Sequence, residues 1–170
     1  MRYLLAASLS FALLGCVSAP RQPNVLQYQQ ASNPAEYEPY MKPGTATVTG
    51  QAFMTTVGGD VKLCAGQPAF LDPVTAVSTL WWSRGPKYNV AAPPPTSIPE
   101  FKAARRVATC DAQGNFKFDK VPAGSYYLST FVTWQVPSTN VFVDPTQGGI
   151  ISVQIEVADG EQKSGLVLTR

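Results

Sequence analysis

Hydrophobic and polar residues alternate through most of the chain after Thr45, with the two-residue period of strands that bury one face. A first strand is expected from Thr45 to Met54, and one of its faces carries small and apolar residues: Ala46, Val48, Gly50, Ala52 and Met54. The most regular alternation comes near the C-terminus, where polar residues separate four β-branched ones: Ile151, Val153, Ile155 and Val157. Both stretches predict half-buried strands.

The segment from Asp111 to Tyr126 predicts a turn, a strand, a second turn and a second strand. Asp111 and Gly114 suit a tight turn, because Asp bonds to its own backbone and Gly tolerates positive φ. Phe116 and Phe118 then alternate with polar residues, and residues 121–124 (Val-Pro-Ala-Gly) turn the chain again. The strand that follows has one face formed by Tyr126, Leu128, Thr130, Val132 and Trp134.

Shorter strands are expected at Val61–Leu63, Ala69–Leu71 and Gly165–Leu168, where Gly, Asp or Pro residues mark turns nearby. Fifteen Pro and thirteen Gly among 170 residues fit a chain with many turns. We therefore predict an all-β fold with one domain over residues 45–170, which is long enough to bury a core.

The N-terminus has the features of a secretory signal. After Arg2, the apolar run from Tyr3 to Leu14 would form a helix of about 18 Å, too short to cross about 30 Å of hydrocarbon. The sequence Leu-Leu-Gly-Cys at 13–16 resembles the bacterial lipobox, whose Cys is lipidated and becomes the first mature residue. An ordinary signal peptide cleaved after Ala19 is the alternative.

The lipobox resemblance implies that residues 1–15 are removed and that Cys16 carries three acyl chains. Several chains anchor a protein stably, whereas one holds it only marginally. Val17 follows the Cys where an Asp would direct retention, and this resembles the sorting pattern of outer-membrane lipoproteins. We expect membrane lipid as a partner through Cys16, on the periplasmic face of the outer membrane or on the cell surface.

Residues 16–44 contain five Pro among Gln, Asn and Ser, and no apolar period runs through them. This composition predicts a flexible, mostly disordered linker. Tyr28, Tyr37 and Tyr40 are unusual for a spacer, so they either dock on the domain or fold onto a partner.

The Asp111–Tyr126 segment also resembles the hallmark of carboxypeptidase regulatory-like domains, and glycines after the first predicted strand resemble that family's opening. The hallmark positions are Asp111, Gly114, Phe116, Phe118, Val121, Pro122, Ala123, Gly124 and Tyr126. The resemblance implies a transthyretin-like (prealbumin-like) Greek-key β-sandwich of about seven strands. It carries no peptidase chemistry, because this sandwich is a general-purpose module.

The chain departs from that family in an insertion at 72–104, which contains Trp81, Trp82 and Tyr88. We expect Val74–Trp82 to be a strand or an irregular element, and Phe101–Ala104 to be one helical turn. Loops on a rigid sandwich often bind ligands, so these aromatics and Trp134 are candidates for contacts with a sugar or a partner. Alternatively, one Trp packs the insertion on the sheet, and an extended backbone would then leave its neighbour exposed.

Cys64 and Cys110 remain once Cys16 is lipidated. An oxidising periplasm favours a disulfide between them, which would staple the base of the insertion and add about 4 kcal/mol of stability. Two buried thiols are the alternative.

Several function classes are excluded or disfavoured by composition. The chain has no His, which rules out Ser-His-Asp and Cys-His catalytic arrangements and removes the commonest metal ligand. The formal charge of +2 falls to +1 when Arg2 leaves with the signal peptide, so nucleic acid is not an expected partner. The Asp111–Asn115 turn lacks the further carboxylates of a calcium loop. We expect no catalytic residues, no metal and no cofactor.

Together these features predict a non-enzymatic lipoprotein that serves as a structural or protein-binding module of a cell-envelope assembly. The alternative is a module that binds peptidoglycan or another polysaccharide through the aromatics of the insertion.

Overall fold

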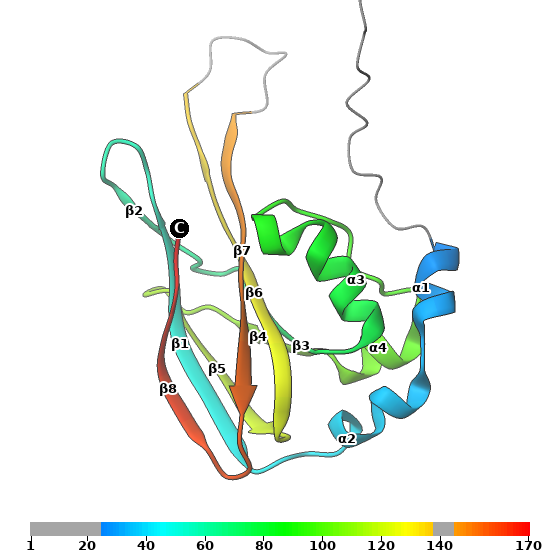
Figure 1. Ribbon diagram of the computed structural model, residues 1–170. Helices are drawn as coiled ribbons and strands as arrows, with labels where there is room; N and C mark the ends of the chain where they lie inside the picture. The colour runs from blue at the N-terminus through cyan, green and yellow to red at the C-terminus, as the bar shows by residue number, and fades with distance from the viewer. Residues whose placement is uncertain (1–24, 138–144) are drawn as a thin grey trace, which may run out of the picture.

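The computed structural model describes residues 25–137 and 145–170, which form two face-to-face β-sheets and a helical layer on one of them (Figure 1). In the first sheet, β1 (Ala46–Thr55) pairs antiparallel with β2 (Val61–Leu63) and β5 (Asn115–Val121), and parallel with β8 (Gln162–Leu168). The second sheet has the order β4 (Arg106–Thr109), β3 (Pro68–Pro73), β6 (Gly124–Gln135) and β7 (Thr146–Val157). The predicted all-β sandwich is confirmed, with eight strands among the described residues.

The first core lies between the two sheets and follows the predicted alternation. Ala46, Val48, Ala52 and Met54 are at most 2% exposed, and Phe116 is 3% exposed. Val153 departs from its pattern, with 38% of its surface exposed, and it lies on β7, one of the two edge strands of its sheet.

The Asp111–Tyr126 segment forms the two turns that its residues predict. Gly114 has a φ of 76°, and its N–H donates to the carbonyl oxygen of Asp111 at 2.9 Å. At the second turn, the hydroxyl of Tyr126 donates to the carbonyl oxygen of Pro122 at 2.8 Å. The hallmark residues therefore shape turns and fill the core.

The insertion folds as helices on the outer face of the second sheet: α3 (Ala76–Arg84), η2 (Pro86–Tyr88) and α4 (Pro99–Ala104) (Figure 1). The expectation of a strand or irregular element at Val74–Trp82 was wrong. Thr75 caps α3 by accepting from the N–H of Ser78, whose hydroxyl accepts from the N–H of Thr75 at 2.8 Å. The helical turn expected at Phe101–Ala104 is present as α4.

The expectation of a disordered linker was wrong from Val25 onward. This segment forms α1 (Val25–Ala31), η1 (Pro34–Glu36) and α2 (Glu38–Met41), and its tyrosines dock on the domain. Tyr37 is fully buried, and its hydroxyl oxygen accepts a hydrogen bond from the Thr75 hydroxyl at 3.0 Å. The Tyr40 ring packs edge-on against the Tyr126 ring, with 5.3 Å between the ring centroids. The predicted signal peptide, Cys16 and the first part of the linker lie outside the described residues.

A second core lies between the helical layer and the second sheet. Its buried residues come from α1, α3, α4, the segments between the helices and β7: Tyr28, Tyr37, Val77, Trp81, Ala92, Ile98, Phe101, Ala104 and Ile150. The second sheet is therefore covered on both faces, whereas no helix of the described residues lies on the outer face of the first sheet (Figure 1). This difference leaves the first sheet as the open side of the sandwich.

Among the described residues, no helix is long and apolar enough to cross a membrane.

Candidate functional site

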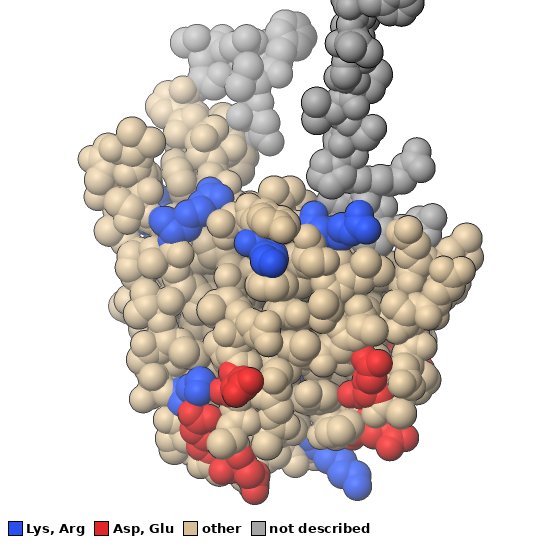
Figure 2. Space-filling view, viewed as in Figure 1, with Lys and Arg blue, Asp and Glu red and all other residues tan. Residues whose placement is uncertain are grey.

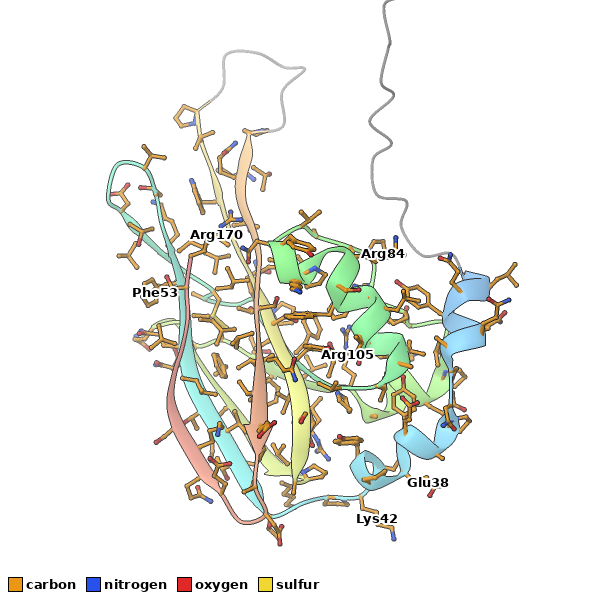
Figure 3. All side chains as sticks on the ribbon, in the orientation of Figure 1. Glu38, Lys42, Phe53, Arg84, Arg105 and Arg170 are labelled. Carbon is orange, nitrogen blue, oxygen red and sulfur yellow. A yellow bond between two sulfur atoms is a disulfide. The ribbon has the colours of Figure 1, made fainter. Side chains whose placement is uncertain are left out.

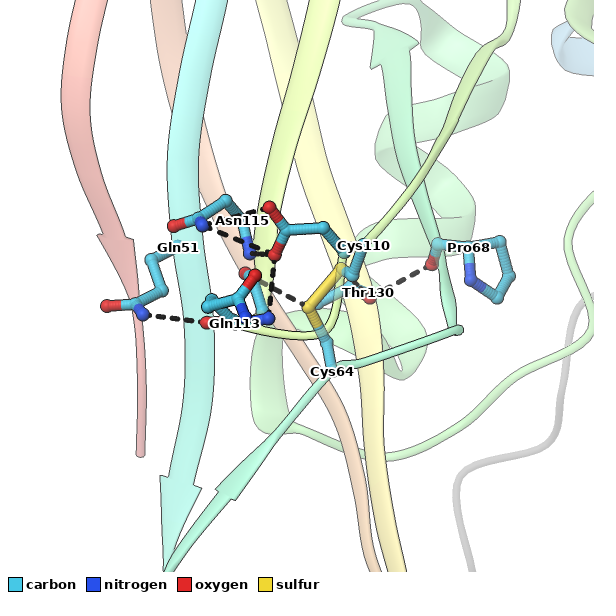
Figure 4. Close-up of a disulfide and its surroundings, with 9 residues drawn as sticks. Gln51, Cys64, Pro68, Cys110, Gln113, Asn115 and Thr130 are labelled. Atoms are coloured by element: carbon cyan, nitrogen blue, oxygen red, sulfur yellow. Dashed lines mark hydrogen bonds between the residues drawn. A yellow bond between two sulfur atoms is a disulfide. The ribbon is translucent and has the colours of Figure 1, made fainter.

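The predicted disulfide between Cys64 and Cys110 is present and joins the two sheets (Figure 4). Cys64 directly follows β2 and Cys110 directly follows β4, with 5.8 Å between their Cα atoms. The backbone N–H of Cys64 donates to Ala52 at 3.1 Å, and that of Cys110 donates to Gln67 at 2.9 Å. This corner of the sandwich is therefore fixed by covalent and hydrogen bonds.

The Asp111 turn starts at this corner and presents a fixed polar group. The Asp111 carboxylate accepts from the backbone N–H groups of Gln113 and Asn115, at 2.9 and 2.8 Å, and from the Asn115 side-chain amide. The bonds from Asn115 hold the pKa of Asp111 below its usual value. The carboxylate therefore stays ionised, with its position set by the turn.

A groove of about 710 Å³ begins at this turn, where the first sheet meets the edge of the second. We call it the sheet-face groove. Residues of β1, β4, β5, β8 and the Asp111 turn line it: Thr49, Gly50, Gln51, Val107, Ala108, Thr109, Asp111, Asn115, Phe116, Lys117, Gly165, Leu166 and Val167. Its size falls within the usual range for small-ligand sites.

The polar side chains of the groove can both donate and accept hydrogen bonds. Gln51 uses its NH₂ group to bond to the carbonyl oxygen of Gln113 at 2.8 Å, so its amide oxygen can accept from a ligand. Thr49 and Thr109 add hydroxyls, and Lys117 adds an ammonium that is 3.0 Å from Asp119. Such a mixture suits a ligand with many hydroxyl groups.

Two apolar side chains complete the lining. Val107 on β4 is 59% exposed and Val167 on β8 is 58% exposed. They can pack against the C–H faces of a ligand. The one aromatic residue of the lining, Phe116, is 3% exposed and belongs to the core, so the groove offers no ring for stacking.

Two of the lining residues are glycines, Gly50 and Gly165. A Cβ at Gly50 would lie 2.6 Å from the Phe116 ring and 2.5 Å from the carbonyl oxygen of Leu166. Gly165 has a φ of 71°, and it lies in the interval between Lys163 and Leu166 where the pairing of β8 with β1 shifts register. No atom of the described chain lies within 4 Å of a Cβ at Gly165, which leaves that side of the groove open.

The predicted binding aromatics lie elsewhere, and Trp81 is not accessible. Its side chain is 2% exposed, its indole N–H donates to the carbonyl oxygen of Ala92 at 3.0 Å, and its ring meets Phe101 edge-on. Trp81 therefore packs the insertion on the sheet, as one of the two sequence hypotheses expected.

Trp82 and Tyr88 come together around Lys87. Trp82 is half-buried and stacks on Tyr127 with 4.5 Å between ring centroids, and its N–H donates to Ser152. The ammonium of Lys87 lies 5.7 Å from both the Trp82 and the Tyr88 ring centroids. Only Tyr88, which is 65% exposed, presents a largely open ring. The expectation that one Trp of the pair is exposed assumed an extended backbone, whereas both Trp residues lie in the helix α3.

Trp134 does not join these residues. It packs against the first core, on the face of β6 opposite to Tyr127, and lies over Gly148. The four candidate aromatics therefore form no common surface.

In residues 25–137 and 145–170, no group of three His, Cys, Asp or Glu side chains is placed to hold a metal ion.

The groove could not be predicted from local sequence patterns, because its residues come from four strands that are distant in sequence. Thr49, Gln51, Asn115 and Lys117 are the outward positions of strands that were predicted correctly. The pairing of β5 and β8 on either side of β1, which brings them together, leaves no local signal.

Comparisons with known proteins show a likeness in structure. No protein-family model matches the chain, and no curated protein matches it in sequence. The chain is similar to a crystal structure from Pseudomonas aeruginosa described as a "putative carbohydrate binding protein". The TM-score is 0.68 at 26% identity, over 82% of this chain and 97% of the other.

Proposed function

We propose that this protein is a non-enzymatic, lipid-anchored module of the bacterial envelope that binds glycan in the sheet-face groove. The observation that carries the proposal is the composition of the groove. Amide, hydroxyl, carboxylate and ammonium groups lie beside two exposed valines on a rigid, uncovered sheet face. Sugars present alternating hydroxyl and C–H surfaces, and this lining complements both.

The groove suits this role better than the aromatics of the insertion. Trp81 is buried. Trp82 stacks on Tyr127, and the Lys87 ammonium lies over its ring. Their contacts serve to attach the helical layer. Tyr88 alone offers a stacking surface, and a single tyrosine provides little selectivity.

The structural neighbour supports the choice of ligand class. A protein of similar fold over nearly its whole length is described as a "putative carbohydrate binding protein". Fold likeness alone does not fix function, so the proposal rests chiefly on the chemistry of the groove.

The second part of the proposal concerns the lipid anchor at Cys16 and the domain family, and it is supported by the sequence. The lipobox-like sequence ending at Cys16 supports lipidation, and Val17 supports an outer-membrane destination. The hallmark from Asp111 to Tyr126 supports membership of the carboxypeptidase regulatory-like domains, which serve widely as non-catalytic modules.

Glycan binding is tested by titrating fragments of peptidoglycan and other envelope polysaccharides into the mature protein by calorimetry. Gln51→Ala and Thr49→Val each remove one hydrogen-bonding group, and each should weaken binding about fivefold. Thr47→Val is the matched control, since Thr47 lies two residues away on the same face of β1 but does not line the groove. Equal affinity in all three variants would exclude the groove.

Anchoring is tested separately by Cys16→Ser. This variant should leave the membrane fraction, while its affinity for glycan stays unchanged. If the variant stays in the membrane fraction, the proposal of a lipid anchor is contradicted and the glycan proposal is unaffected.

An envelope protein is the second candidate partner, and the open strand edges favour it. β8 and β4 are edge strands on opposite sides of the groove, and each presents an exposed valine. A partner could add a strand at such an edge. A photo-crosslinker at Val167 should then capture one protein in cells, whereas the glycan proposal predicts crosslinks to polysaccharide.

A further inference from the structure

We propose that a second surface of this protein, at the end where the described chain begins, docks on the anionic phospholipid of the membrane that holds Cys16. This inference rests on the proposed lipid anchor and is independent of the glycan site. Six exposed residues form the surface, and we call it the anchor-side surface: Val25, Leu26, Arg84, Lys87, Tyr88 and Val90.

Neighbouring contacts connect these residues. α1 packs against α3, and burial raises the pKa of Tyr28 while the nearby charge of Arg84 partly lowers it. Arg84 ends α3, and the next residue, Gly85, accepts a hydrogen bond from the N–H of Val90 at 3.1 Å. Lys87 lies against the Tyr88 ring in the same turn. The start of α1, the end of α3 and η2 therefore present one continuous surface.

Apolar side chains are prominent on this surface. Leu26 is 64% exposed, Tyr88 is 65% exposed, and Val25 and Val90 are each 52% exposed. The two basic residues lie among them. Apolar and aromatic side chains interspersed with Lys and Arg are the composition of surfaces that rest on membrane interfaces.

The distribution of charged side chains also favours contact between the upper end of the molecule and an anionic membrane. Figure 2 shows Lys and Arg side chains across the upper part of this face, whereas Asp and Glu side chains gather at the lower end together with some basic ones. Figure 3 places Arg84 at the upper end, and Glu38 and Lys42 at the lower end. An anionic bilayer would attract the upper end and repel the acidic lower end.

The length of chain before α1 brings this end to the bilayer. Eight residues lie between Cys16 and Val25, and the nine Cα-to-Cα steps from Cys16 to Val25 span at most about 30 Å when fully extended. Charges within about 8–10 Å of the headgroups feel the negative surface potential of an anionic bilayer at physiological salt. A tether this short keeps the start of α1 near the membrane, so the anchor-side surface is the part of the domain that meets it.

Docking in this orientation leaves the sheet-face groove free. The groove lies on the outer face of the first sheet, and the helical layer with α1 covers the outer face of the second (Figure 1). The domain would then rest on lipid by the upper end of its helical layer, where the anchor-side surface lies, while the groove faces the envelope space.

The test uses the full lipidated protein in vesicles that carry a nitroxide quencher at the headgroup. One set contains phosphatidylglycerol and phosphatidylethanolamine, and the other contains phosphatidylcholine alone. A fluorophore is attached through Gln29→Cys, which lies on α1 one turn after Val25, or through Glu38→Cys at the opposite end. The label at position 29 should be quenched at least threefold more in anionic than in neutral vesicles, and the label at position 38 should be quenched equally in both.

Matched charge reversals complete the test. Arg84→Glu with Lys87→Glu should abolish the extra quenching at position 29. Lys42→Glu with Lys102→Glu changes the net charge equally at the far end and should leave the quenching intact. Equal quenching of both labels in a protein that stays on the vesicles would overturn the docking surface and leave the anchor standing. A protein that does not stay on the vesicles would overturn both.

Discussion

The guanidinium of Arg105 holds the carboxylate of Asp72 at two points, with Nε 2.6 Å from Oδ1 and Nη2 2.7 Å from Oδ2. Asp72 is fully buried near the end of β3 and is the first residue of the insertion, while Arg105 directly follows its last residue. The guanidinium carbon is also 4.5 Å from the Phe70 ring centroid and 4.8 Å from that of Phe101. This pair therefore closes the base of the insertion and attaches α4 to the second sheet.

Replacing Arg105 should destabilise the protein strongly. Arg105→Met leaves a buried carboxylate without a partner, which should lower the free energy of unfolding by about 3–5 kcal/mol at pH 7. Lys117→Ala breaks the exposed pair with Asp119 and should cost below about 1 kcal/mol. Urea denaturation measures both, and similar losses in the two variants would contradict the role given to Arg105.

The loss in Arg105→Met should also depend on pH. Burial raises the pKa of Asp72, and Arg105 offsets part of that effect. Without Arg105 the folded state binds a proton more tightly than the unfolded state, so the stability deficit should shrink as pH falls below the raised pKa. Adding Asp72→Leu should remove most of the deficit, because the uncompensated charge is gone.

Gly114 should tolerate no side chain, for two separable reasons. Its φ of 76° strains any L-residue, and a Cβ there would lie 2.9 Å from the carbonyl oxygen of Ala52. Gly66 is the matched control, with a φ of 74° and no described atom within 4 Å of an added Cβ. Gly66→Ala should cost about 1–2 kcal/mol from backbone strain alone. Gly114→Ala should cost at least about 1 kcal/mol more from the steric contact, and equal losses in thermal unfolding would refute the close approach.

The carboxylate of Asp111 should stabilise the fold only above acidic pH. Hydrogen bonds from Asn115 lower its pKa in the folded state from the ordinary value of 3.8. Its contribution is therefore complete above that value and is lost as the pH falls through the lowered folded pKa. Asp111→Ala should be less stable than the parent at pH 7, and the difference should become smaller by pH 2. A constant difference across this range would show that the charge has no part in the turn.

The strands were predictable because their signals are local. Alternation located β1, β5 and β7, and Asp111 with Gly114 located the turn before β5. The helix α3 was missed because its β-branched and aromatic residues fit a strand equally well. The signals that mark its ends are Thr75 as cap and the run Arg84-Gly85-Pro86 as stop.

The ordered N-terminal segment was missed for a different reason. Its Pro and Gln content gives it no periodic pattern, and its order depends on single side chains that reach into the domain. Tyr37 bonds to Thr75, and Tyr40 lies against Gly124 and Tyr126. The tyrosines were visible in the sequence as unusual residues for a spacer, and docking on the domain was one of their two expected roles, but the residues that they contact leave no local signal. The groove formed by four separate strands was hidden for the same reason.

The most direct test of the central proposal is to map glycan contacts by nuclear magnetic resonance on ¹⁵N-labelled mature protein. Titration with peptidoglycan and polysaccharide fragments should shift the backbone amides of Gln51, Lys117, Gly165 and Val167, which surround the sheet-face groove. Amides near Trp82 and Tyr88 should stay unchanged. Shifts confined to the insertion, or no shifts with any fragment at millimolar concentration, would contradict glycan binding in the groove.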